Sequence, residues 1–141
     1  MSWYECGNGS GSMMGNDGDK GAATRRILIV DDNSDAAELL AELVRLCGYE
    51  VAVEFSGPSA LRTVLGFQPH VVLLDIGMPE MDGYQVAQLL RAMPDLNGLR
   101  IIALTAWGDA EARARTAACG FNLHLTKPAP LPALLGALEA G

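Results

Sequence analysis

Five short apolar runs alternate with longer amphipathic segments from Arg25 to the end of the chain. This alternation is typical of a parallel sheet whose strands are joined by helices. Three of the runs contain almost only Val, Ile and Leu, as strands covered on both faces do. The expected strands, in chain order, are Ile27–Val30, Glu50–Glu54, Val71–Leu74, Ile101–Leu104 and Asn122–Leu125.

The segments between and after these runs have the spacing of helices. The first, Ser34–Cys47, carries one apolar stripe, the pattern of a helix packed on a core, and Gly48 ends it. The stripe consists of Ala36, Leu39, Leu40, Leu43 and Cys47. The second helix begins at Gly57-Pro58, and the third begins near Asp82 and stops at Pro94. The fourth and fifth are expected over Asp109–Cys119, which is poor in apolar mass and therefore mobile, and Leu131–Ala140.

Composition favours one domain with its own core, because half of the 141 residues are apolar. Residues 1–23 are rich in Gly, Ser, Asn and Asp, which predicts a flexible leader, either a tag or a linker. The domain is therefore placed at residues 24–141. Cys6, Cys47 and Cys119 lack the number and spacing of a disulfide framework or a zinc site, so we interpret them as incidental thiols.

The formal net charge is -7, which disfavours direct binding to nucleic acid or to an anionic membrane surface. No apolar run approaches the roughly 20 residues that span a bilayer, and the first residues lack the order of a secretory signal. We therefore expect a cytoplasmic protein whose partners are proteins or small anions with a metal.

Polar residues of specific types stand where four of the expected strands end. Asp31 and Asp32 follow the first strand, Asp75 follows the third, Thr105 follows the fourth, and Lys127 lies just past the fifth. In an open parallel sheet the carboxyl ends of the strands share one edge, where ligands bind. These five side chains should therefore converge.

Three carboxylates at one edge repel one another unless a cation lies among them. Oxygen ligands of this kind suit Mg2+, which keeps some waters that phosphate oxygens can replace. One carboxylate is then free to attack phosphorus and form an aspartyl phosphate, with Lys127 and the Thr105 hydroxyl facing the transferred oxygens.

Four ordered motifs resemble the receiver domains of two-component response regulators, over Arg25 to about Ala140. The motifs are Ile29–Asn33, Leu73–Gly83, Ala103–Ala106 and Lys127-Pro128. The resemblance implies an α/β fold of the flavodoxin-like, doubly wound kind, with a five-stranded parallel sheet, (βα)5, in strand order 2-1-3-4-5. It also implies a phosphoacceptor signalling domain rather than an enzyme acting on a separate substrate.

The resemblance assigns roles to these residues. Asp75 corresponds to the phosphoacceptor, and Asp31 and Asp32 to the carboxylates that hold Mg2+ together with Asp75. The backbone carbonyl of Gly77 is a further metal ligand. Thr105 corresponds to the hydroxyl that moves toward phosphate.

Three more positions carry expectations from the same resemblance. Lys127 corresponds to the cation that binds phosphate. His124 stands where the family usually has an aromatic switch residue. Gly77 and Trp107 occupy the positions that face the attacking water, which predicts slow loss of phosphate because glycine has no side chain to position a water.

The implied partner is a sensor histidine kinase or a histidine phosphotransfer protein, and a homodimer through the fourth helix, fifth strand and fifth helix is a further option. The segment Phe121–Pro128 favours a receiver attached to a hybrid histidine kinase over a stand-alone regulator. A pseudo-receiver that binds partners without phosphorylation remains the alternative. A haloacid-dehalogenase-type hydrolase is disfavoured because Gly77 stands where such enzymes have a second Asp, and no nucleotide-binding loop follows the first strand.

Overall fold

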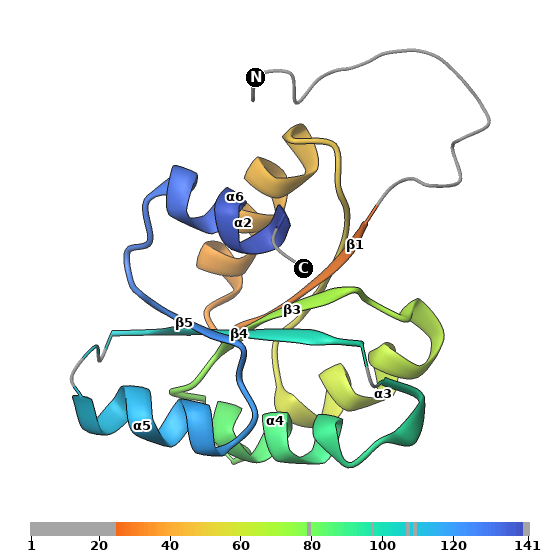
Figure 1. Cartoon of the computed structure of the whole chain (residues 1–141). Helices are drawn as coiled ribbons and strands as arrows, with labels where there is room; N and C mark the ends of the chain where they lie inside the picture. Colours follow the sequence, from red (N-terminus) through yellow and green to blue (C-terminus); the bar gives the residue numbers. More distant parts are fainter. Residues whose placement is uncertain (1–24, 79, 97, 107, 109, 140–141) are drawn as a thin grey trace.

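The computed structural model describes residues 25–78, 80–96, 98–106, 108 and 110–139 (Figure 1). The expected leader at residues 1–23, with Cys6, lies outside the described residues. The strands form a parallel sheet in the order β2-β1-β3-β4-β5, as expected. Their bounds are β1 Arg26–Val30, β2 Glu50–Glu54, β3 Val71–Asp75, β4 Arg100–Thr105 and β5 Leu123–Thr126.

Helices cover both faces of this sheet (Figure 1). Helices α2 and α6 lie on one face, and α3, α4 and α5 lie on the other. The helix bounds are α2 Ser34–Leu46, α3 Gly57–Phe67, α4 Gly83–Arg91, α5 Ala110–Ala118 and α6 Leu131–Glu139, with a short 3-10 helix at Pro94–Leu96. Each face of the sheet therefore has its own apolar core. The apolar residues of β1, β3 and β4 are buried because helices cover both faces.

Local sequence signals set the helix ends. Asn33 caps α2 by accepting the N–H of Ala36, and Gly48 follows the helix with a φ of 98°. In α4, the Asp82 side chain accepts the N–H of Gln85 at 3.0 Å, and the Gln85 side chain accepts the N–H of Asp82 at 3.1 Å. This capping box satisfies two backbone donors that the helix leaves open. The predicted start of the third helix near Asp82 is confirmed.

The apolar stripe predicted for the first helix meets the core only along one side, where Leu40 and Cys47 are half-buried against it. The residues of α2 that are buried are Ala37, Ala41 and Val44. The larger Leu39 and Leu43 of the predicted stripe are 64% and 38% exposed. The physical reason is that α2 has two adjacent apolar faces, and the one with small side chains allows the helix axis to lie close to the sheet.

Helix α5 is weakly anchored, as its composition predicts. Among the described residues of α5, Thr116 is the one that is buried. Helix α6 buries four apolar residues, which are Leu134, Leu135, Ala137 and Leu138. In the described part of the chain, no helix has both the length and the apolar content that crossing a membrane requires.

Candidate functional site

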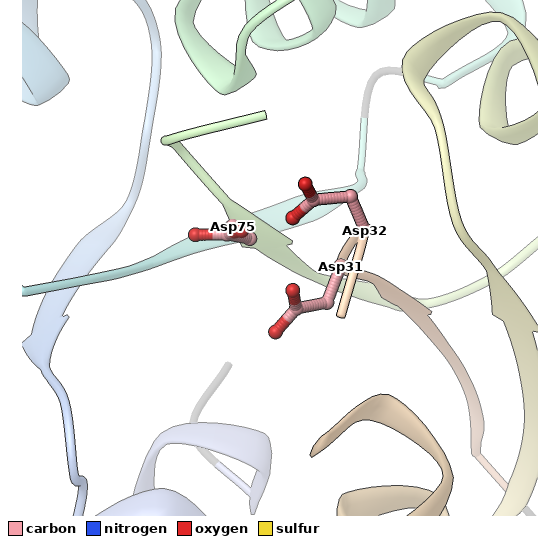
Figure 2. Close-up of side chains that lie close together, drawn as sticks. All are labelled: Asp31, Asp32 and Asp75. Carbon is pink, nitrogen blue, oxygen red and sulfur yellow. The ribbon is translucent and has the colours of Figure 1, made fainter. Parts of the chain in front are cut away.

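The carboxyl end of the sheet brings Asp31, Asp32 and Asp75 together (Figure 2). Asp31 and Asp32 directly follow β1, and Asp75 is the last residue of the adjacent strand β3. One carboxylate oxygen from each lies within 4.8 Å of the others. Asp31 and Asp75 are buried, at 7% and 8% exposure, and Asp32 is exposed. We refer to these three residues as the acidic pocket.

Lys127 contacts two carboxylates of this pocket. Its ammonium nitrogen lies 3.2 Å from Asp31 Oδ2 and 3.3 Å from Asp75 Oδ1. Its backbone N–H donates to the Thr105 carbonyl at 2.7 Å, which fixes the loop after β5 to the end of β4. The predicted convergence of a lysine from the fifth strand with carboxylates from the first and third is therefore present.

The pocket penalises the ionised form of Asp75. Burial and the nearby Asp31 carboxylate raise the pKa of Asp75, and the Lys127 ammonium and the Gly77 N–H offset only part of this rise. Burial alone would lower the pKa of Lys127, but its attraction to Asp75 and Asp31 raises it overall. One ammonium group thus does not neutralise the three carboxylates of the pocket.

These features fit a hard divalent cation. All three donors are carboxylate oxygens, which is the ligand chemistry that Mg2+ prefers over sulfur or imidazole. Two of them are buried beside each other, and a cation would relieve the repulsion that raises the pKa of Asp75. The Gly77 N–H donates to Asp75 Oδ1 at 3.3 Å, so this loop folds against the acceptor carboxylate.

Thr105 ends β4 and is 2% exposed. Its neighbour Leu104 pairs with Asp75 in the sheet register, and Thr105 itself pairs with Thr126 of β5. Thr105 is therefore one position past the residue that pairs with Asp75 on the adjacent strand. Trp107, the other residue predicted near phosphate in this loop, lies outside the described residues.

His124 of β5 is half-buried and faces α5. Its Nδ1 lies 3.1 Å from Oγ1 of Thr116, whose hydroxyl is also 2.9 Å from the Arg113 carbonyl. Sequence reasoning did not find Thr116. A lone threonine in an Ala- and Arg-rich helix gives no signal until the fold brings it to β5.

Gly83 is a second residue whose contacts the sequence did not reveal. Its N–H donates to the Ile76 carbonyl at 3.0 Å, so the start of α4 lies against the backbone that carries Asp75. A Cβ atom at Gly83 would lie 2.7 Å from the Asp75 carbonyl oxygen and 2.8 Å from Ile76 Cα. Only glycine permits this approach without movement of the backbone.

This doubly wound sheet, with an acidic pocket at its carboxyl edge, defines a receiver-type fold, and comparison with known proteins agrees. The family model for the response regulator receiver domain matches residues 27–139. The chain is 36% identical over 122 residues to the transcriptional regulatory protein PrrA of Mycobacterium bovis, covering 86% of this chain and 52% of PrrA.

Two solved structures show the same fold. The chemotaxis protein CheY4 of Vibrio cholerae superposes with a TM-score of 0.79 at 26% identity, covering 83% of this chain and 98% of CheY4. The receiver domain of a signal transduction histidine kinase from Syntrophus aciditrophicus gives 0.76 at 32% identity, covering 82% and 88%.

The chain belongs to the response regulator receiver domain family. It is a phosphoacceptor signalling module of two-component systems rather than a conventional enzyme. A receiver domain in general implies a histidine kinase partner. The chain spans about half the length of the PrrA relatives that it matches.

Proposed function

We propose that this domain takes a phosphoryl group from a phosphohistidine onto Asp75, with Mg2+ held by Asp31, Asp32, Asp75 and the Gly77 carbonyl. The observation that carries the proposal is that the buried carboxylates of Asp31 and Asp75 share one ammonium, Lys127, with a third carboxylate beside them. Such a pocket holds charged side chains in a low-dielectric environment, where their electrostatic interaction with a phosphoryl group is strong.

In the proposed reaction, a carboxylate oxygen of Asp75 forms a bond to phosphorus while the bond from the donor imidazole nitrogen breaks. The imidazole leaves with the bonding electron pair. If its other ring nitrogen carries a proton, it leaves as neutral imidazole; if not, the departing nitrogen takes up a proton from solvent. The Lys127 ammonium, which contacts Asp75 Oδ1 before transfer, is placed to form an ion pair with a phosphoryl oxygen. Bound Mg2+ would supply further neutralisation of the charge on the phosphoryl group.

The output of this reaction is a change of surface. In our proposal the Thr105 hydroxyl moves toward the phosphoryl group, and His124 follows it inward. Because His124 contacts Thr116 of α5, this movement would shift a helix with one buried residue. Phosphorylation then biases a weakly anchored element rather than the core.

The donor would be a sensor histidine kinase or a histidine phosphotransfer protein, in the cytoplasm where ATP supplies such donors. We do not propose direct contact with nucleic acid or membrane, given the formal net charge of -7. A second copy is a further candidate partner through the face of α5, β5 and α6. Similarity to a histidine kinase receiver and to a transcriptional regulatory protein of which the match covers 52% supports attachment to other domains in either arrangement.

The proposal is tested by incubating the protein with acetyl phosphate and Mg2+, with and without EDTA, and recording intact mass. We expect one phosphate adduct that requires the metal and is lost on treatment with hydroxylamine, which cleaves acyl phosphates. If a folded, Mg2+-binding protein forms no adduct, the phosphoacceptor role is rejected and the pseudo-receiver scaffold is favoured.

A slow loss of phosphate is a further expectation. Gly77 is exposed and offers no side chain to orient a water toward the phosphoryl group. We expect Gly77→Asn, whose amide can hold a water there, to shorten the phosphate half-life on the order of ten-fold. Removing free acetyl phosphate and following the adduct by mass measures both half-lives, and a wild type as short-lived as the variant would contradict this expectation.

A further inference from the structure

An uncovered row of leucines runs along α2 on the side away from the sheet. Leu39, Leu43 and Leu46 are 64%, 38% and 81% exposed. Their spacing of four and then three residues places them on one face of a helix with about 3.6 residues per turn. We call these three residues the leucine stripe. They are three of the large apolar side chains that the described surface exposes, and burying them would remove apolar area from water.

Charged side chains border the leucine stripe along one flank. Glu38, Glu42 and Arg45 are exposed, and the helical repeat places all three on the same side of the stripe. The Arg45 guanidinium donates to the Val51 carbonyl of β2 at 3.2 Å, so this flank is the one beside the sheet edge. The acidic pair lies toward the middle and start of α2, and the base lies in its last turn.

We propose that the leucine stripe is an interface between two copies of this chain, with the two α2 helices packed antiparallel about a two-fold axis. In this arrangement Leu39 faces Leu46 of the second copy, and the two Leu43 side chains meet near the axis. A two-fold axis uses the same patch on both copies, so one self-complementary stripe is sufficient.

The charges determine the direction of packing. When the helices run antiparallel, Arg45 lies opposite the gap between Glu38 and Glu42 of the second copy, and symmetry repeats this contact at the other end. Parallel packing about a two-fold axis would place the two charged flanks on opposite sides of the interface, where Arg45 would not meet the glutamates of the second copy. The antiparallel arrangement is therefore the one in which opposite charges meet.

The alternative face of α5, β5 and α6 offers less apolar surface. Among the described residues of these three elements, Leu123 is the one large apolar side chain that is exposed, at 37%. The exposed residues of α6 before Glu139 are Pro132, Ala133 and Gly136, none of which has a large side chain. An interface along a single helix is small, and we expect a dissociation constant in the micromolar range.

Sedimentation equilibrium of the whole chain, from about 10 µM to about 1 mM, tests the proposal against this range of affinity. We expect a reversible dimer in the wild type and a dissociation constant at least about 30-fold weaker in Leu43→Glu. Leu65→Glu, the same change at a leucine of α3 that is 65% exposed, is the matched control and should leave the constant unchanged. Leu123→Glu should also leave it unchanged.

A charge reversal provides a second test that does not depend on the leucines. Arg45→Glu should weaken the dimer on the order of five-fold, and the triple variant Arg45→Glu, Glu38→Arg, Glu42→Arg should return it to within about three-fold of wild type. A wild type that stays monomeric throughout overturns the proposal and leaves the stripe to a different protein. Dissociation by Leu123→Glu with no effect of Leu43→Glu overturns it in favour of the other face.

Discussion

Asp75→Asn is expected to take up no phosphate from acetyl phosphate and Mg2+, and to be more stable than the wild type in EDTA. The amide keeps the shape of the side chain but is not a nucleophile toward phosphorus. It also removes one of two buried carboxylates, while Lys127 keeps its contact with Asp31 at 3.2 Å. We expect the thermal midpoint to rise by roughly 2–5 °C at neutral pH.

The stability difference should depend on pH with a definite sign. Burial, with repulsion from Asp31, raises the pKa of Asp75 above its ordinary value of 3.8, so the folded state holds this proton more tightly than the unfolded chain does. Ionisation of Asp75 therefore costs the folded wild type stability as pH rises from that value through the folded pKa. The advantage of Asp75→Asn should grow over this interval, as thermal unfolding at several pH values would show.

Asp82→Asn is the matched control for this experiment. It makes the same chemical change seven residues along the chain, at a helix cap outside the acidic pocket, and asparagine is also a good capping residue. We expect it to form the phosphate adduct and to show no comparable gain in stability. Phosphate uptake by Asp75→Asn would reject Asp75 as the sole acceptor, and a loss of stability in EDTA would mean that the attraction to Lys127 outweighs burial and repulsion.

Gly83→Ala is expected to be the most destabilising single-methyl change near the site. The added Cβ would approach two backbone atoms, the Asp75 carbonyl oxygen at 2.7 Å and Ile76 Cα at 2.8 Å. Backbone in the central strand cannot swing aside as a flexible side chain does, so β3 or α4 must move. We expect a loss of about 2–4 kcal/mol in the free energy of unfolding and slower phosphorylation, because the same backbone positions the acceptor carboxylate.

Gly66→Ala separates this steric effect from the general effect of replacing a glycine. Gly66 lies inside α3, and a Cβ there would meet nothing within 4 Å. Alanine favours the helix, so this variant should gain up to about 1 kcal/mol. Denaturant unfolding of both variants gives the comparison, and a Gly83→Ala protein as stable as the wild type would show that the loop relaxes without cost.

Much of this architecture was predictable from local pattern. The five apolar runs were placed to within about a residue of the observed strands, because strands covered on both faces must be continuously apolar. The acidic pocket was also predictable, since parallel strands deliver their carboxyl ends to one edge. The role of Thr116 and the close approach of Gly83 to β3 were not predicted, because both depend on contacts that only the folded chain makes.

Helix α2 shows most clearly what the sequence alone decided and what it left to the tertiary structure. Periodicity predicted a helix here, with one apolar stripe that includes Leu39 and Leu43. It did not determine which side of the helix meets the sheet. The structure places the small Ala37 and Ala41 inward and leaves Leu39 and Leu43 exposed. Pattern is a property of one segment, whereas burial depends on how closely two segments approach, and only the folded chain determines that distance.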